Sequence, residues 1–260
     1  MLRALGQKSC ALASNSKSAR ATYTTDVTFN REALRRYSRQ IILPEIALSG
    51  QQRLSAASVL VIGAGGLGAP ALTYLTSSGV GRIVVSEDDT LDLSNLQRQF
   101  LFDSTQIGGS KLELALRRLR ALNPLIALEG TARFEPDNAI GLISSVDLVV
   151  DASDNASTRY LVSDTCERLE KTWVWGAAEG FTGMTAVFDH TLTLRDAFPD
   201  PVSDDNCDTV GVFAPLLGMV GSQMASAALK LLIGLPVPRG LLTLIDALEG
   251  TTRAVKLRRS

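Results

Sequence analysis

The sequence predicts an α/β fold: a doubly wound, Rossmann-like and mostly parallel sheet with antiparallel strands near the C-terminus. Short β-branched runs alternate with amphipathic stretches, and this alternation is typical of parallel strands joined by right-handed crossovers. A glycine-rich turn, residues 63–68, follows the first strand candidate directly and opens the next helical stretch. The last four strand candidates lack long helices between some pairs, which favours antiparallel pairing there.

Hydrophobic periodicity predicts the individual elements. The first, second, fourth and fifth strand candidates are nearly continuous apolar runs, as in central strands covered on both faces. In the helix predicted over 110–122, leucine and alanine recur at three- and four-residue spacing while arginines face elsewhere. The predicted strands are Ser58–Ile62, Arg82–Ser86, Leu125–Glu129, Asp147–Asp151, Trp173–Gly176, Met184–Phe188, Leu242–Asp246 and Arg253–Leu257. The predicted helices are Gly66–Ser78, Ser110–Leu122, Asp137–Ser144, Asn155–Lys171 and Pro215–Leu232.

One domain is predicted over residues 29–260, because no linker rich in Pro, Gly or Ser divides this part of the chain. The stretch Asp189–Asp208 interrupts the α/β pattern with Pro199, Pro201 and several aspartates. A polar insert of this length in a compact domain is usually a functional or a disordered loop. We expect it to be a crossover loop that passes near the site.

Residues 1–28 are expected to lie outside the fold. They contain several Lys, Arg, Ser and Ala residues and no acid before Asp26, as in an organellar transit peptide. A disordered tail or a misassigned start codon is the alternative. No apolar stretch of the kind found in secretory signals is present. The expected location is therefore cytoplasmic, or the mitochondrial matrix if the leader is a transit peptide.

Composition excludes several classes of protein. The 26 Lys and Arg residues nearly balance the 27 Asp and Glu residues, so charge-driven binding to nucleic acid is not expected. Three cysteines, Cys10, Cys166 and Cys207, are too few for a disulfide framework or a four-cysteine zinc site. The longest apolar runs fall short of the roughly 20 residues that span a membrane, so no membrane association is expected.

The first strand and the turn after it form a nucleotide-binding pattern. The glycines of the turn, Gly63, Gly65, Gly66 and Gly68, allow the backbone to approach a phosphate at the start of a helix. The acidic run Glu87–Asp89 follows the second strand, where a carboxylate can accept hydrogen bonds from ribose hydroxyls. This pattern alone is generic, and NAD would be its default ligand.

Further polar groups follow the strand ends, where the crevice of an open sheet lies. They are the segment Ser94–Gln99 with Arg98, Lys111 at a helix start, and Asp154 after the fourth strand. An arginine fork and a lysine charge beside a glycine loop suit a triphosphate, and an aspartate can hold Mg²⁺ against its oxygens. Taken singly, Arg98 would be a surface ion-pair residue, Lys111 a solvated helix residue and Asp154 a helix N-cap. Their coincidence at one sheet edge favours the nucleotide site.

Together these segments resemble the ThiF/MoeB/HesA family of E1-like adenylyltransferases. The resemblance runs from about Leu34 to about Leu257, and the combination of segments is far more specific than any one of them. The segments that carry it are Arg36-Tyr37-Ser38-Arg39-Gln40, the GAGGLG turn at 63–68, SNLQRQ at 94–99, Gly108 with Lys111, Asn123-Pro124 and Ser153-Asp154-Asn155.

The resemblance implies an E1-like adenylation fold and ATP- and Mg²⁺-dependent activation of a ubiquitin-like sulfur-carrier protein. The C-terminal carboxylate of the carrier, which ends in Gly-Gly, would attack the α-phosphate and give an acyl adenylate and pyrophosphate. The activated carrier would supply sulfur transfer for molybdopterin, thiamine or thiolated-tRNA synthesis.

The same resemblance assigns roles to individual residues. Arg98 and Lys111 would neutralise charge at the α-phosphate and at the leaving pyrophosphate, and Asp154 would bind Mg²⁺. An arginine matching Arg39 reaches into the partner subunit's site in this family, which implies a homodimer. The residues expected to contact ATP are Gly63, Gly65, Gly66, Gly68, Glu87, Asp89, Ser94, Asn95, Leu96, Gln97, Arg98, Lys111, Asp154 and Asn155.

The chain departs from the family pattern at two places. The ribose-binding residue is usually Asp, and here Glu87 stands at that position, so Asp88 or Asp89 would share the role. Many relatives carry two CxxC pairs that hold zinc, whereas residues 191–196 and the C-terminal residues contain no cysteine. No structural zinc is therefore expected.

The cysteines receive different interpretations. Cys207 matches the position of a reactive cysteine in several relatives, where it forms a thioester or an acyl disulfide during sulfur handling. Asp204, Asp205 and Asp208 flank it, and negative neighbours would raise the pKa of its thiol. If Cys207 has no such role, the acyl adenylate would pass to a separate sulfurtransferase. Cys166 lies in a predicted helix and is expected to be packed.

Three alternatives remain open from the sequence. An NAD-dependent dehydrogenase would account for the glycine turn but not for Arg98, Lys111 and Asp154. A catalytically inactive E1-like scaffold that only binds the carrier is slightly favoured by the missing zinc cysteines. A relative that activates a tRNA nucleoside carboxylate has little support from the near-neutral charge.

Overall fold

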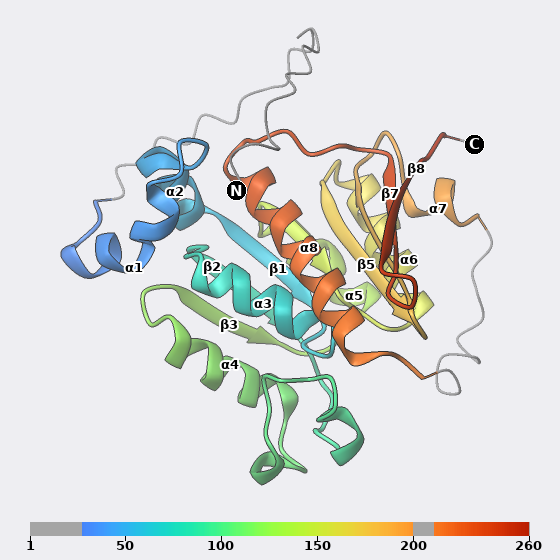
Figure 1. Ribbon diagram of the computed structural model, residues 1–260, viewed down its shortest axis with the longest axis horizontal. Helices are drawn as coiled ribbons and strands as arrows, with labels where there is room; N and C mark the ends of the chain where they lie inside the picture. The colour runs from blue at the N-terminus through green and yellow to red at the C-terminus, as the bar shows by residue number, and fades with distance from the viewer. Residues whose placement is uncertain (1–27, 200–210, 260) are drawn as a thin grey trace, which may run out of the picture.

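The computed structural model describes residues 28–199 and 211–259, and an eight-stranded sheet forms its centre (Figure 1). The strand order is β3-β2-β1-β4-β5-β6-β7-β8. The order reverses between β1 and β4, which is the position where open α/β sheets bind their ligands. The strands are β1 (Ser58–Ile62), β2 (Arg82–Ser86), β3 (Ala127–Thr131), β4 (Leu148–Asp151), β5 (Trp173–Glu179), β6 (Thr182–Phe188), β7 (Leu241–Asp246) and β8 (Thr251–Lys256).

The predicted fold class is confirmed. Strands β1 to β5 pair in parallel, and β6, β7 and β8 extend the sheet in antiparallel fashion. β1 and β2 begin and end at the predicted residues. The third strand begins at Ala127 and not at Leu125, because the side chain of Asn123 accepts a hydrogen bond from Leu125 N at 3.2 Å and keeps the chain in a turn.

Helices cover both faces of the sheet (Figure 1). One face packs against α2, α3, α4 and α8, and the other against α5 and α6. No helix in the described ranges combines the length and the apolar character needed to cross a membrane. The helices are α1 (Arg31–Ile41), α2 (Ala47–Ala56), α3 (Gly68–Ser77), α4 (Lys111–Leu122), α5 (Pro136–Ser144), α6 (Ala156–Arg168), α7 (Leu194–Ala197) and α8 (Ala214–Leu232).

Helices α1 and α2 were not predicted from the sequence. Only two residues of the eleven-residue α1, Ala33 and Tyr37, are buried, so the hydrophobic period is too sparse to identify a helix. Side-chain hydrogen bonds fix both helices in the fold: the amides of Gln40 and Gln51 donate to the carbonyl oxygen of Ser78 at 2.9 and 3.0 Å. α1 and α2 therefore lie beside the C-terminal end of α3.

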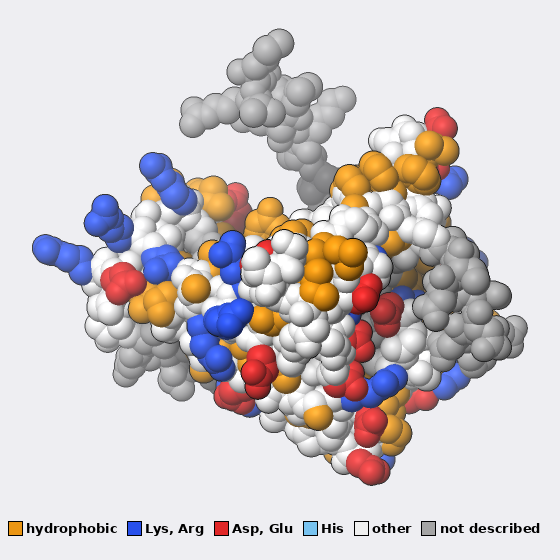
Figure 2. Space-filling view, turned by 90° about the horizontal axis from the view of Figure 1, so that it is seen from below, with side chains coloured by type: hydrophobic (Ala, Val, Ile, Leu, Met, Phe, Trp, Pro, Cys, Tyr) orange, Lys and Arg blue, Asp and Glu red, His pale blue; other side chains and the backbone are white. Residues whose placement is uncertain are grey.

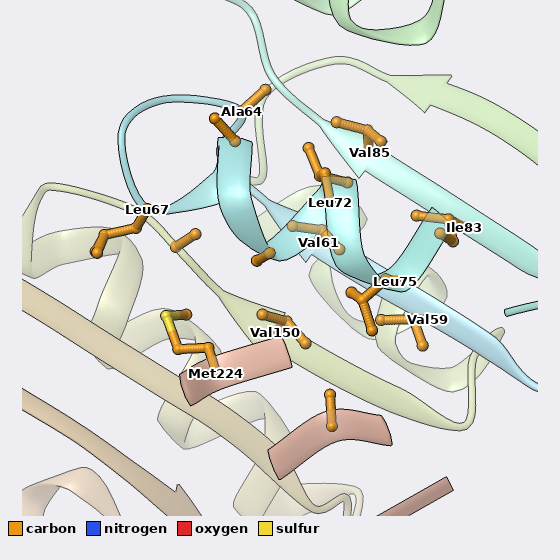
Figure 3. Close-up of a cluster of buried hydrophobic side chains, with 14 of the residues drawn as sticks. Val59, Val61, Ala64, Leu67, Leu72, Leu75, Ile83, Val85, Val150 and Met224 are labelled. Atoms are coloured by element: carbon orange, nitrogen blue, oxygen red, sulfur yellow. The ribbon is translucent and has the colours of Figure 1, made fainter. Parts of the chain in front are cut away.

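Tight packing between β1, β2 and α3 forms the core beneath the glycine turn (Figure 3). Figure 3 shows Val59 and Val61 of β1 and Leu72 and Leu75 of α3 close to one another. Met224 of α8 joins the same cluster, since α8 lies alongside α3. These side chains are almost fully withdrawn from water, so the start of α3 is held rigidly against the ends of β1 and β2.

The polar insert predicted over Asp189–Asp208 is partly folded, which corrects its interpretation as a loop. Residues 194–197 form the short helix α7, and its Thr193 N-cap and Asp196 are joined in a capping box. Arg195 forms a bidentate ion pair with Asp164 of α6, in which both N–O distances are 2.8 Å. Residues 200–208 of the insert lie outside the described residues.

Contact between α3 and α8 depends on a glycine, which gives a stability test. A Cβ on Gly221 would lie 2.5 Å from the carbonyl oxygen of Leu67, whereas a Cβ on Gly218 of the same helix would meet open space. We expect Gly221→Ala to lower the free energy of unfolding by about 1–3 kcal/mol through overpacking. Gly218→Ala, the matched control, is expected to raise it by up to about 1 kcal/mol because alanine favours helix. Thermal unfolding measures both, and equal effects would contradict the packing.

Candidate active site

The glycine turn between β1 and α3 is closely packed against the end of β4. Gly63 has a φ of +91°, and a Cβ there would lie 2.8 Å from the carbonyl oxygen of Ala152. A Cβ on Gly68 would overlap the carbonyl oxygen of Gly63. Because side chains are excluded at both positions, the turn packs backbone to backbone against the end of β4, and this fixes the start of α3, the kind of helix end that binds anions. The turn thus sits at the switch point of the sheet, between β1 and β4.

Glu87 connects the end of β2 to the glycine turn. Its Oε2 accepts a hydrogen bond from Ala64 N, and its Oε1 accepts hydrogen bonds from the backbone N–H groups of Asp88 and Asp89, each at 2.9 Å. The half-buried carboxylate is therefore fixed beside the turn. Three of its acceptor positions already serve the backbone.

Lys111 is buried, and its interpretation as a solvated helix residue is wrong. The residue is 5% exposed, and its Nζ forms an ion pair with Asp89 Oδ2 at 2.8 Å. Its backbone N–H also donates to the Asp89 carbonyl oxygen, so both groups of Lys111 join α4 to the end of β2. Hydrogen bonds from Ser94 lower the pKa of Asp92, and the charge of Lys111 adds a smaller contribution in the same direction. The ammonium group thus acts on the neighbouring polar segment.

The segment Ser94–Gln99 forms a compact turn that begins with a capping box. Asp92 accepts a hydrogen bond from Ser94 N, and the Asn95 Oδ1 accepts one from Asp92 N. The amide nitrogen of Asn95 takes no part in this cap and can donate to an anion. Leu96 is packed against the core, while Ser94 and Gln97 are exposed.

Arg98 is half-buried and forms no ion pair with any residue in the two described ranges. Its Nη1 donates to the Ser94 carbonyl oxygen at 3.0 Å, which orients the side chain and leaves its other N–H groups available. The structure thus does not support the simpler interpretation of Arg98 as a surface ion-pair residue. Next to it, Gln99 is buried beside Gly65, and its Oε1 has no hydrogen-bond partner. Gln99 ends the SNLQRQ segment, and its sequence context indicates no role for it.

The end of β4 carries the third group of polar residues. Asn155 caps α6 by accepting a hydrogen bond from Thr158 N at 2.9 Å, so the N-cap is Asn155 and not Asp154. Asp154 itself is exposed at the carboxyl edge of the sheet. Asp151 is fully buried, and burial raises the pKa of its carboxyl group while the hydrogen bond with Ser153 and the charge of Arg159 oppose this shift.

Among the described residues, most of the predicted site residues lie around the glycine turn, but Arg39 does not. Arg39 lies near the opposite edge: Tyr37, two residues earlier, accepts a hydrogen bond from Asn123, which follows the C-terminal end of α4. Helices α3 and α4 start at the glycine-turn edge and end at the other edge, so Arg39 is remote from the site of its own chain. Cys207 lies outside the described residues.

Comparisons with known proteins identify the family. The family model described as the ThiF family matches residues 37–260. A sulfur carrier protein adenylyltransferase of Thermus thermophilus is 45% identical over 244 residues, which cover 89% of this chain and 90% of that protein. The probable adenylyltransferase/sulfurtransferase MoeZ of Mycobacterium tuberculosis is 39% identical over 88% of this chain, which spans only 62% of MoeZ. The chain belongs to the ThiF family.

Solved structures agree with the fold of this ThiF-family chain. The crystal structure of E. coli MccB with MccA-N7isoASN superimposes with a TM-score of 0.78 at 20% sequence identity, covering 89% of this chain and 74% of that one. At that identity the similarity concerns the fold alone. The eight-stranded mixed sheet of the ThiF-family chain is therefore an architecture shared with solved proteins of different sequence.

The site of the ThiF-family chain has the donors that an anionic ligand needs and oxygen ligands for a cation. Glu87, Asp88 and Asp89 place carboxylate oxygens within 4.8 Å of one another. Glu87 already accepts a hydrogen bond from the backbone of the turn, and Asp89 already pairs with the Lys111 ammonium. These three acids are therefore poorly suited to binding a metal ion. Asp154 is exposed, and its carboxylate is the hard donor that Mg²⁺ prefers, so this position fits the ion better. Acidic, basic and hydrophobic side chains all occur on the face seen from below in Figure 2.

Cys166 gives a test of the packed face behind the site. It is fully buried on α6, and burial raises the pKa of its thiol far above the ordinary value, with the charge of Asp151 adding to the shift. Since the thiolate is the reactive form, we expect iodoacetamide at pH 8 to alkylate Cys166 at least roughly tenfold more slowly in the native protein than in urea. Peptide mass spectrometry separates Cys166 from the other two cysteines. Equal rates in the two states would contradict the burial.

Proposed function

We propose that this protein is an ATP-dependent adenylyltransferase that activates the C-terminal glycine carboxylate of a ubiquitin-like sulfur-carrier protein. The observation that carries the proposal is that residues next to Lys111 and Arg98 contact the glycine turn. Buried Lys111 pairs with Asp89, two residues after the Glu87 that accepts a hydrogen bond from Ala64 of the turn, and Arg98 precedes the Gln99 that lies against Gly65. Two cationic side chains near such a turn suit a triphosphate. The names of the Thermus and mycobacterial relatives support the same reaction class.

In the proposed reaction an oxygen of the carrier carboxylate forms a bond with the α-phosphorus of ATP. The bond from that phosphorus to the bridging oxygen breaks, and pyrophosphate leaves with the electron pair. The nucleophile is already an anion, so no general base is needed. Catalysis then rests on positioning the two anionic reactants and on neutralising the charge that develops between them.

The chain's own residues divide this work. The N–H groups at the start of α3 and the amide nitrogens of Asn95 and Asn155 donate to phosphate oxygens, because the side-chain oxygens of both asparagines serve as caps. Arg98 and Lys111 neutralise the α-phosphate and the leaving pyrophosphate. Glu87 holds the turn and accepts hydrogen bonds from the ribose. Asp154 would hold Mg²⁺, which when bound neutralises phosphate charge.

A homodimer completes the proposed site. Arg39 is exposed on the last turn of α1, remote from the site of its own chain. Large apolar side chains follow it in the chain, with Ile42 exposed at 68%, and Tyr74 of α3 is also exposed, at 52%. A groove of about 390 Å³, almost entirely apolar, continues this surface between Leu43 and Leu229 of α8. We infer that a second copy covers this surface and receives Arg39 in its site.

The later steps follow from the chemistry of the product. An acyl adenylate is activated for attack by a sulfur nucleophile, so a sulfurtransferase, or a cysteine of this chain, is expected to consume it. Cys207 is our candidate for that cysteine. Which pathway the carrier serves, molybdopterin, thiamine or thiolated-tRNA synthesis, is decided by the identity of the carrier.

Exchange between ATP and labelled pyrophosphate tests the adenylation. Purified protein with Mg²⁺ is expected to catalyse exchange only when a carrier ending in Gly-Gly is added. Arg98→Ala, Lys111→Ala and Asp154→Ala should each reduce the rate by roughly 100-fold or more, since each removes charge stabilisation in the transition state. Arg118→Ala, an exposed arginine on α4, is the matched control and should keep the wild-type rate. Wild-type exchange in all three site variants would refute the proposed site.

Mixed dimers test the role of Arg39. Arg39→Ala chains and Asp154→Ala chains are each expected to be inactive alone. When they are mixed, the Arg39→Ala chain keeps its own Asp154 and receives an intact Arg39 from its partner, so one site per mixed dimer should recover activity. Sedimentation verifies the dimer. Verified mixed dimers without activity would show that Arg39 does not act across the interface.

A further inference from the structure

Two charged side chains, the fully buried Asp151 and the half-buried Arg159, hold the backbone N–H and carbonyl groups of Ser153, one residue before Asp154. The Ser153 N–H donates to Asp151 Oδ1 at 3.0 Å, and the Ser153 carbonyl oxygen accepts a hydrogen bond from Arg159 Nη2 at 3.1 Å. Asp151 lies at the end of β4 and Arg159 in the first turns of α6. Hydrogen bonds from one residue of β4 and one residue of α6 therefore hold the connection between these two elements.

This arrangement lowers the stability of the fold unless it has another role. Burying a carboxylate and a guanidinium costs free energy unless their hydrogen bonds are satisfied. Here Asp151 Oδ2, Arg159 Nε, Ser153 Oγ and the Trp175 Nε1 beside them are buried without a partner. They are four of the six such side-chain atoms within the described residues. Asn155 already caps α6, so starting the helix does not need the charged pair.

The segment held by these hydrogen bonds, residues 152 and 153, also lies next to the glycine turn. Ala152 N donates to the Ile62 carbonyl oxygen at 2.9 Å, and the Ala152 carbonyl oxygen faces the position of Gly63. A shift of residues 152 and 153 would therefore move Asp154 relative to the turn that binds the phosphates. The distance between the two halves of the proposed site depends on this connection.

We propose that Asp151 and Arg159 are positioning residues that hold the Ser153 peptide so that Asp154 meets the Mg²⁺ carried by ATP at the glycine turn. This inference rests on the proposed nucleotide site and adds the two residues that keep its cation ligand in place. Neither residue needs to touch the substrate. Their effect passes through the backbone of residues 152–154.

Asp147, the residue directly before β4, provides a matched control. Its Oδ2 accepts hydrogen bonds from the N–H and the hydroxyl of Ser58 at 2.8 and 2.7 Å, so it also holds a backbone group with a carboxylate. It does so at the opposite edge of the sheet, where β1 begins. Replacing Asp147 therefore removes comparable contacts without disturbing the proposed site.

The test measures ATP affinity with and without Mg²⁺ by calorimetry, and amide hydrogen exchange over residues 152–156, in the full chain without carrier. We call the factor by which Mg²⁺ increases ATP affinity the Mg²⁺ gain. In Asp151→Ala and Arg159→Met this gain is expected to fall at least tenfold, while the ATP affinity without Mg²⁺ stays within about twofold of the wild-type value. Exchange over 152–156 should accelerate roughly tenfold, as for one lost hydrogen bond. Asp151→Asn, which keeps an acceptor oxygen, should restore most of the gain. Asp147→Ala should lower the melting temperature but keep the gain.

Several outcomes would overturn the proposal. The proposal is wrong if folded Asp151→Ala and Arg159→Met proteins keep the wild-type Mg²⁺ gain. It is also wrong if Mg²⁺ does not change the ATP affinity of the wild-type protein. If both truncations fail to fold, Arg159→Lys keeps the positive charge but not the planar guanidinium, and the factor by which Mg²⁺ raises its ATP affinity should fall at least threefold. Full retention there would overturn the proposal. Missing carrier-dependent exchange in the wild type would instead refute the adenylation, because these readouts need no carrier.

Discussion

The close approach of the glycine turn to the end of β4 is the contact on which the site depends. Gly63 and Gly68 leave no room for a Cβ, so the turn and the Ala152 carbonyl group meet backbone to backbone. This brings the start of α3 to the switch point of the sheet. Everything proposed for the phosphates, including the roles of Asn95 and Lys111, presupposes that position.

The chain concentrates its buried charges at this edge of the sheet. Lys111, the first residue of α4, and Asp151, the last residue of β4, are withdrawn from water, and Arg159 in the first turn of α6 is half-buried with its Nε buried. Desolvating such groups costs free energy, and a core built for stability alone would use apolar residues in their place. Their position beside the glycine turn is explained by function: preorganised charges need no rearrangement when an anionic ligand arrives.

Sequence patterns found most of the fold and most of the candidate site, but not the supporting residues. β1 and β2 were predicted residue for residue because buried parallel strands are continuous apolar runs. Helix α1 was missed because only Ala33 and Tyr37 of its surface are buried. The hydrogen bonds from Asp151 and Arg159 to the Ser153 backbone were not predicted. The two charged residues lie eight positions apart in the sequence, and nothing in that spacing indicates that both reach the same residue.

The sequence by itself determined the α/β class, the glycine turn and the polar segments after the strand ends, because local patterns of burial and turn formation specify them. Only the tertiary structure decided how each polar residue is used. It buried Lys111 on Asp89, left Arg98 without an ion pair among the described residues, gave the helix cap to Asn155 and placed Arg39 at the far edge. These outcomes depend on contacts between segments far apart in the chain, and such contacts are set by packing and by the exclusion of water.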